Sequence, residues 1–190
     1  MSTQHHHPFE QFVYCPKCGS TEFRAINPQA KHCDACNFTY YFNPSSACMC
    51  FITDRYNKVL VALRGEDPAM GTLDLPGGFI QSYETAEEGM AREIKEETHI
   101  DALSGFRGGV ISPLRYLFSL PNIYTYSGFD VHTLDMVFHM EVESVEPFVG
   151  TGTDDVAELV SIPLNNLNPK DFGLASVSKA VEIVLNGHYI

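Results

Sequence analysis

The chain has 190 residues, of which 44% are hydrophobic, enough for one main domain with a proper core and one small module. Its formal net charge is −12, and so acidic a molecule repels nucleic-acid backbones unless a metal screens it. The longest apolar runs are strand-sized and interrupted, which predicts no membrane span. With no secretory signal, we expect reduced thiols and a cytoplasmic protein.

Two cysteine pairs come first along the chain. Cys15 and Cys18 form one C-x2-C pair, and Cys33 and Cys36 form a second after an interval of fourteen residues. This spacing predicts a tetrahedral zinc site, because thiolates are soft ligands and a two-residue gap lets one tight turn present both sulfurs. About thirty residues cannot bury enough apolar surface to fold alone, so the zinc would be structural. A redox pair or two disulfides are the competing interpretations.

The remaining pattern predicts a larger domain after this ribbon. We expect a flexible N-terminus at residues 1–14, a zinc ribbon at 15–42, a linker at 43–46 and the catalytic domain at 47–190. Strand patterns occur near residues 47–53, 58–64, 104–118, 132–143 and 156–162. Helical patterns begin near Thr85 and cover residues 176–185. Strands on both sides of a helix indicate an α/β protein with a mixed sheet between helices. Cys48 and Cys50 alternate along a strand and are expected to be core thiols.

The segment from Gly78 to Ile100 carries a cluster of glutamates. At about 100° per residue, Glu93, Glu96 and Glu97 share one arc of a helix, and the same projection puts Arg92 off this face. Three carboxylates on one face repel each other, so the pattern favours a bound Mg²⁺ or Mn²⁺. Thr85 with Glu88 predicts a capping box at the helix start. The alternative is a merely solvated acidic face.

This segment resembles the Nudix box, G-x5-E-x7-R-E-U-x-E-E-x-G-U, in which U is a bulky aliphatic residue. Eight defined positions hold the expected type, namely Gly78, Glu84, Arg92, Glu93, Ile94, Glu96, Glu97 and Ile100. His99 stands where the family has a glycine that would end the helix in a left-handed conformation, which histidine can adopt at modest cost. Gln81 and Tyr83 replace the acidic residue and the glycine often found before the box glutamate.

The resemblance implies an α/β/α Nudix sandwich and Mg²⁺-dependent hydrolysis of a pyrophosphate bond. It implies that Glu93, Glu96 and Glu97 carry the metal, with the backbone carbonyl of Gly77 or Gly78 as a further ligand. Glu84 would join this shell. The matching arginine of the family orients a catalytic carboxylate, which gives Arg92 a supporting part.

Substrate contacts are less well defined by the sequence. Arg64, at the end of a strand, is the candidate phosphate contact, although it could be a surface arginine. A loop with Asp154, Asp155 and Glu158 could supply a general base, or its acids could be merely solvated. Tyr116, Phe118, Tyr124 and Tyr126 could stack on a base or ribose, or could be ordinary strand aromatics.

A zinc ribbon ahead of such a domain is similar to the NADH pyrophosphatase group, whose S-Q-P-W-P-F-P marker is missing here, because the chain contains no tryptophan. The expected substrates are therefore ADP-ribose, a nucleotide sugar or an NADH-like dinucleotide. A non-catalytic nucleotide sensor and a protein that processes nucleic-acid ends remain alternatives. The ribbon has a net charge of only +1, from Lys17, Arg24 and Lys31 against Glu22 and Asp34. It more readily fits packing on the catalytic domain or contacts in a homodimer.

Overall fold

The computed structural model describes residues 10–103, 109–126, 128–153, 156–187 and 189–190, without the side chain of Tyr126. The chain forms two compact units, Met1–Ser45 with Ile123–Thr133, and Ser46–Asn122 with Leu134–Ile190. The N-terminal segment thus groups with a piece of chain far away in sequence, which the sequence did not indicate. The domain limits expected at residues 15–42 and 47–190 stay a prediction.

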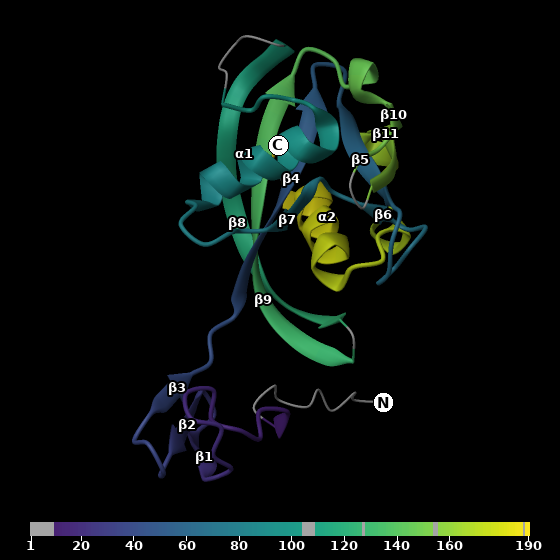
Figure 1. The fold of residues 1–190 in the computed structure, drawn as a ribbon. Coiled ribbons are helices and arrows are strands. Elements are labelled where there is room, and N and C mark those ends of the chain that lie inside the picture. Colours follow the sequence, from purple (N-terminus) through teal and green to yellow (C-terminus); the bar gives the residue numbers. More distant parts are fainter. Residues whose placement is uncertain (1–9, 104–108, 127, 154–155, 188) are drawn as a thin grey trace. The chain divides into compact units, whose positions relative to one another are not determined.

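The smaller unit contains a three-stranded antiparallel sheet (Figure 1). Its strands are β1 (Phe23–Asn27), β2 (Ala30–Cys33) and β3 (Thr39–Tyr41). Phe12 packs its ring against Tyr40, Phe42 and Phe129, with ring centroids 5.7 to 6.1 Å apart. The ring of Phe42 also meets His132 edge-on. These contacts join residues around Phe129 and His132 to the ribbon, because aromatic pairs at such distances attract beyond their buried area.

The larger sheet is mixed, as predicted. Its strands are β4 (Ser45–Asp54), β5 (Lys58–Arg64), β6 (Leu73–Asp74), β7 (Gly77–Phe79), β8 (Val110–Tyr126), β9 (Phe129–Val142), β10 (Gly150–Thr151) and β11 (Val156–Pro163). The order is β10-β11-β5-β4-β9-β8, with β6 on β5 and β7 on β4. The ends of β4 and β9 coincide, since Thr53 Oγ1 lies 2.8 Å from His139 Nε2 and the Val145 amide donates to Asp54 Oδ2. These two strands are therefore parallel, whereas β4–β5 and β5–β11 are antiparallel.

Two helices cover opposite faces of this sheet. Cys48 and Cys50 of β4 pack with Ile94 of α1 (Ala86–Thr98), whereas the intervening Met49 packs with Val181 of α2 (Ala175–Gly187). Since successive strand residues point to opposite faces, the helices form the two outer layers. The predicted α/β/α sandwich is confirmed. Cys48 and Cys50 are buried core thiols, and burial raises the pKa of Cys48 to about 12.

The long hairpin differs from its prediction. The sequence pattern ended one strand at residue 118 and began the next at 132, but β8 continues to Tyr126 and β9 starts at Phe129 (Figure 1). The observed strand contains Pro113 and Pro121. They are tolerated because β8 lies at the end of the strand order, where a strand has one side without ladder partners.

Short connections complete the fold. They include the 3-10 helices η3 (Glu146–Phe148), η4 (Leu164–Asn166) and η5 (Pro169–Asp171). Within the described parts of the chain, no helix has the length and apolar character needed to cross a membrane.

Candidate active site

Both ends of α1 are fixed by local contacts, which sets the direction of its glutamates. Thr85 Oγ1 accepts from the Glu88 amide at 3.2 Å, and Glu88 Oε2 accepts from the Thr85 amide at 2.9 Å. The predicted capping box is thus present. At the other end, His99 has φ 63° and ψ 7°, and its amide donates to the Lys95 carbonyl at 3.0 Å. Histidine therefore adopts the left-handed conformation expected of the glycine it replaces.

Strand β7 brings two carboxylates of α1 to the sheet. The Gly77 amide donates to Glu97 Oε2 at 3.0 Å. Gly78 lies so close to Glu93 that a Cβ there would stand 2.7 Å from Glu93 Oε1, and a Cβ on Gly77 would stand 2.1 Å from the Cys48 carbonyl oxygen. Glu93 and Glu97 are both buried. Glycine at both positions therefore lets β7 approach β4 on one side and the carboxylates on the other.

Arg92 connects the acidic groups. Its Nε donates to Glu84 Oε1 at 2.8 Å, and its Nη1 donates to Glu93 Oε1 at 2.7 Å and to Glu96 Oε2 at 2.9 Å. The hydrogen bond from Arg92, followed by that from the Gln81 amide, lowers the pKa of Glu84. The carboxylates in turn raise the pKa of Arg92. The helical projection put Arg92 off the glutamate face, and this describes its backbone correctly. Its side chain, however, is long enough to extend to the glutamate face and contact the carboxylates there.

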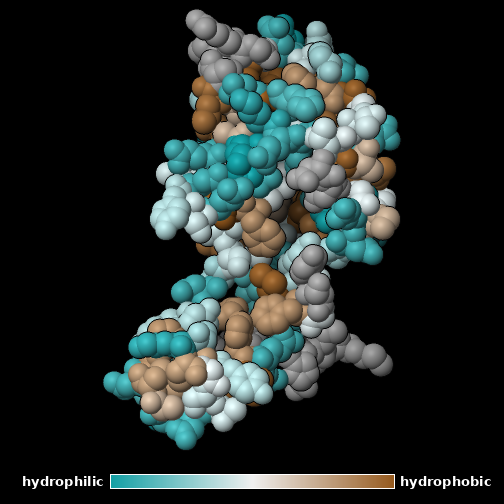
Figure 2. Space-filling model, viewed as in Figure 1, coloured by the Kyte–Doolittle hydropathy of each residue, from teal (hydrophilic) through white to brown (hydrophobic). Residues whose placement is uncertain are grey.

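The arrangement suits a divalent cation. Glu84, Glu93, Glu96 and Glu97 supply four carboxylates against one guanidinium, and hard oxygen donors of this kind favour Mg²⁺ or Mn²⁺. Figure 2 shows hydrophilic residues gathered over α1, where Glu87, Glu88, Lys95 and Glu96 are exposed. The carboxylates are not drawn into one tight group, because Arg92 lies among three of them. Among the described residues, only the four ribbon cysteines form a cluster with all ligand atoms within 4.8 Å.

Arg64 lies near Glu97 at the end of β5, and its role as a phosphate contact stays a prediction. It lines a small cavity of about 10 Å³ together with Asp74, Gly77 and Glu97. Its Nη1 donates to Asp74 Oδ2 at 2.5 Å and its Nε to the Pro68 carbonyl at 2.8 Å. Two guanidinium nitrogens thus already have acceptors, so Arg64 is held rigidly next to Glu97.

The other predicted substrate residues are scattered. Glu158 is exposed on β11, and Tyr124 is half-buried on β8. Asp155 and the Tyr126 side chain lie outside the described residues. Tyr116 packs edge-on against Phe138, and Phe118 packs against Tyr189, so these two rings have partners within the fold.

Sequence reasoning missed one residue at the end of α1. Thr153 Oγ1 donates to the carbonyl oxygen of Glu96 at 2.5 Å and lies 3.4 Å from that of Glu97. It thereby satisfies carbonyls that the last helical turn leaves free. A threonine next to two acids carries no local signal of this role.

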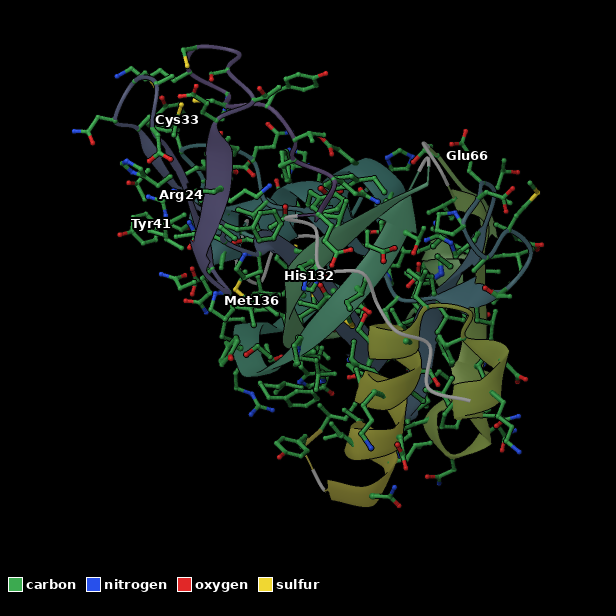
Figure 3. The ribbon with its side chains drawn as sticks, turned by 90° about the horizontal axis from the view of Figure 1, so that it is seen from below. Arg24, Cys33, Tyr41, Glu66, His132 and Met136 are labelled. Carbon is green, nitrogen blue, oxygen red and sulfur yellow. The ribbon has the colours of Figure 1, made fainter. Side chains whose placement is uncertain are left out.

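The four cysteines of the ribbon converge. All are free thiols, with Cys15 Sγ 3.7 Å from Cys36 Sγ and Cys18 Sγ 3.7 Å from Cys33 Sγ. A tetrahedral ion with metal–sulfur bonds of about 2.3 Å has sulfur–sulfur edges of about 3.8 Å, so these distances fit zinc and not disulfides. Figure 3 shows sulfur atoms gathered beside Cys33 at one end of the ribbon. The two C-x2-C pairs form the same type of turn. In each, the residue directly after the second cysteine has a positive φ, namely Gly19 after Cys18 and Asn37 after Cys36.

Comparison with known proteins agrees with this site. The sequence matches the NUDIX domain family over residues 43–180. The ADP-ribose pyrophosphatase of Methanocaldococcus jannaschii is 34% identical over 136 residues, which is 70% of each chain. The NAD-capped RNA hydrolase NudC of Vibrio atlanticus is 30% identical over 118 residues, covering 62% of this chain and 40% of that protein. The chain thus spans less than half the length of this second relative.

Solved structures share the fold. A NUDIX hydrolase from Nitrosomonas europaea superposes with a TM-score of 0.61 at 20% identity, covering 92% of this chain and 93% of that one. The NUDIX domain of Shewanella oneidensis NrtR, solved as a complex with ADP ribose, gives 0.54 at 16% identity, covering 76% and 88%. By its family match and its box from Gly78 to Ile100, this chain belongs to the Nudix family.

Proposed function

We propose that this protein is a Mg²⁺- or Mn²⁺-dependent pyrophosphohydrolase that cleaves a nucleoside diphosphate linked to another group, with ADP-ribose as the first candidate. The observation that carries the proposal is the placement of Glu93 and Glu97 against β7, where the Gly77 amide holds Glu97. The relative from M. jannaschii, similar over 70% of each chain, is named an ADP-ribose pyrophosphatase.

The glutamates would hold the cation, with Glu93, Glu96 and Glu97 as its carboxylate ligands and the Gly78 carbonyl beside them. Such a cation offsets phosphate charge and lowers the pKa of a bound water. Glu97 is fixed by the Gly77 amide and lines the same cavity as Arg64. This shared lining supports Arg64 as the residue that would contact a phosphate oxygen close to Glu97. Arg92 also donates to the Phe79 carbonyl at 3.0 Å, so it ties Glu84 and β7 to the helix.

The ribbon would hold one structural zinc through Cys15, Cys18, Cys33 and Cys36. Four thiolates fill a tetrahedral site and leave no position for a substrate, so this ion stabilises the fold and takes no part in hydrolysis. The homodimer and the cytoplasmic location expected from the sequence stay proposals.

A second candidate substrate is an NAD-capped RNA end, in which the same type of bond is cleaved. It is favoured by the several relatives named NAD-capped RNA hydrolase, including those of Vibrio atlanticus and Caenorhabditis elegans. Against it, the chain covers only 40% and 23% of those two proteins, and the molecule has a net charge of −12.

The test is to incubate the protein and Mg²⁺ with ADP-ribose, NADH, a nucleotide sugar and NAD-capped RNA, and to identify the products. We expect AMP and ribose 5-phosphate from ADP-ribose, with turnover abolished in Glu97→Gln. Glu87→Gln is the matched control, because Glu87 lies exposed in the first turn of the same helix. Binding without turnover across the whole panel would instead identify a nucleotide sensor.

A further inference from the structure

Asp135 on β9 is a buried carboxylate. Its relative exposure is 4%, and in the part of the chain that the structure describes its Oδ1 has no hydrogen-bond partner. A carboxylate oxygen removed from water without a hydrogen bond destabilises the folded state. Its neighbour two residues along the strand is Val137, which is fully buried in the apolar core. An aliphatic residue would therefore suit the position of Asp135 better if packing alone decided it.

The carboxylate belongs to the face of the sheet that α2 covers. Val137 packs in the apolar cluster with Met49, Leu75 and α2, and by strand alternation Asp135 shares its face. Met136, labelled in Figure 3, points to the other face and packs with the cluster of α1. Ser176, in the first turn of α2, is equally buried, and its Oγ has no partner among the residues that the structure describes. Thr133, two residues before Asp135 on the same face of β9, is also buried, and its Oγ1 has no hydrogen-bond partner among the described residues. Asp135 is thus one of three buried polar side chains with an atom that the described part of the protein does not satisfy.

Asp135 also lies at the level of the catalytic glycines. Because β4 and β9 are parallel and Thr53 lies beside Met140, residue 135 falls beside the part of β4 from Ala47 to Met49. That part of β4 pairs with β7 on its other side, Met49 with Gly77. At a spacing of about 4.8 Å between strands, the backbones of Gly77 and Asp135 are roughly 10 Å apart.

Residues from both faces of the sheet line one small cavity beside β7. The cavity next to Glu97 is lined both by Ala62, from the α1 side of the core, and by Leu75, from the α2 side. Leu75 belongs to the same cluster as Val137. The separation of Gly77 and Asp135 is comparable to the length of a nucleoside monophosphate, so a ligand whose pyrophosphate lay at Glu97 would reach Asp135 if its nucleoside extended past Leu75.

We propose that Asp135 is a specificity-determining residue that accepts a hydrogen bond from the nucleoside end of the substrate. An ionised carboxylate only accepts hydrogen bonds, so the matching groups are a ribose hydroxyl or an exocyclic amine of the base. This inference rests on the proposed function, since it places the pyrophosphate at Glu97. A substrate with the donor satisfies the buried carboxylate, whereas a ligand without it leaves the carboxylate unsatisfied. The site therefore binds ligands that carry the donor more tightly than ligands that lack it.

The experiment compares Asp135→Asn and Asp135→Leu with the parent in ADP-ribose hydrolysis and in thermal unfolding without ligand. We expect KM to rise at least tenfold in both variants, with kcat within threefold, while Asp135→Leu melts at an equal or higher temperature. Glu141→Gln, a charge removal on the same strand, should leave KM unchanged. An unchanged KM in the Asp135 variants, or a lower melting temperature of Asp135→Leu, overturns the inference.

Two further arms identify the donor and separate the two proposals. If the ribose hydroxyl is the donor, the parent should bind the 2′-deoxy substrate as weakly as Asp135→Asn binds ADP-ribose. If the exocyclic amine is the donor, the parent should bind the hypoxanthine analogue that weakly instead. Should the parent hydrolyse nothing, the proposed function fails, and ADP-ribose binding by calorimetry decides about Asp135. Tenfold weaker binding to Asp135→Asn still supports the role, whereas equal binding, or none to the parent, refutes it.

Discussion

Replacing each of the two adjacent glycines of β7 by alanine should separate stability from metal binding. A Cβ on Gly77 would stand 2.1 Å from the Cys48 carbonyl oxygen and 2.8 Å from Met49 Cα, both backbone atoms. Relief requires β7 to move away from β4 by about 1 Å, because nonbonded carbon atoms attract only at about 3.5 Å and beyond. That movement breaks the pairing of Met49 with Gly77 and the 3.0 Å hydrogen bond from the Gly77 amide to Glu97.

The size of the effect follows from these contacts. A hydrogen bond to a charged group contributes about 1.5 to 3 kcal/mol, and each backbone hydrogen bond of the ladder about 1 kcal/mol. Gly77→Ala should therefore cost about 3 kcal/mol, which lowers the melting temperature by roughly 6 to 12 °C in a chain of this size. Gly78→Ala meets only the Glu93 carboxylate, at 2.7 Å. A side chain can swing away, so this variant should lose less than about 1 kcal/mol but should displace Glu93.

The assays are thermal unfolding by circular dichroism and the initial rate of AMP release over a range of Mg²⁺ concentrations. Gly78→Ala should need at least tenfold more Mg²⁺ for half-maximal rate while melting close to the parent. Ser46→Ala, an exposed change near the pairing partners of β7 on the same strand, is the control and should alter neither quantity. Gly77→Ala that melts within 2 °C of the parent, or Gly78→Ala with unchanged Mg²⁺ dependence, would refute this account of the glycines.

Four further changes test other parts of the structure. His99→Gly should raise the melting temperature by roughly 2 to 4 °C, because glycine adopts φ 63° without the cost of about 1 kcal/mol that a Cβ brings; His99→Ala should not. Arg92→Met should lower both activity and melting temperature, and added Mg²⁺ should recover part of the melting temperature, since a cation can offset the charges of Glu84, Glu93 and Glu96. Burial, and secondarily the charge of Arg115, lowers the pKa of His139 from 6.5 to about 4. Below pH 6.5 the unfolded chain therefore binds a proton that the folded chain does not, and the free energy of unfolding should fall by about 1 to 2 kcal/mol between pH 6.5 and pH 4. Urea titration measures this fall, which should be smaller in His139→Gln. Cys33→Ser should lose the bound zinc seen by elemental analysis, whereas Cys48→Ser, a core thiol outside the cluster, should keep it.

The parts of the fold that the sequence predicted well are those with local signals. The capping box of Thr85 and Glu88 involves residues three apart in the sequence, so the chemistry of the segment decides it. The strand at residues 58–64 was also predicted with its observed limits. The C-x2-C pairs likewise determine two short turns from local sequence. Only the convergence of the four sulfur atoms on one site depends on the rest of the ribbon.

The parts that the sequence did not predict depend on distant partners. The extension of β8 to Tyr126 needs the neighbouring β9, and the grouping of residues Ile123–Thr133 with the N-terminal segment includes the ring of Phe12 on Phe129. Nothing near Phe12 in the sequence identifies a partner more than a hundred residues away. For the same reason the sequence does not reveal that Asp135 is buried. An acidic residue within a strand normally alternates onto the exposed face, and its burial is recognised only when its neighbours in space are known.

Arg92 illustrates a different limit, which concerns the site itself. A helical projection assigns each residue one direction, and for Arg92 that direction leads away from Glu93 and Glu96. The side chain is long enough to return and contact both, at 2.7 and 2.9 Å. The protein thus supplies its own countercharge to a face whose carboxylates would otherwise repel each other. Arg92 also donates to the Phe79 carbonyl, which is not one of the carboxylates. The arginine can therefore give up Glu93 and Glu96 to a cation and still tie β7 to the helix. Arg92 can thus support β7 and also lie among the glutamates. The melting temperature of Arg92→Met with and without Mg²⁺ separates these two contributions: the part of the loss that Mg²⁺ restores comes from the countercharge, and the remainder from the supporting contacts.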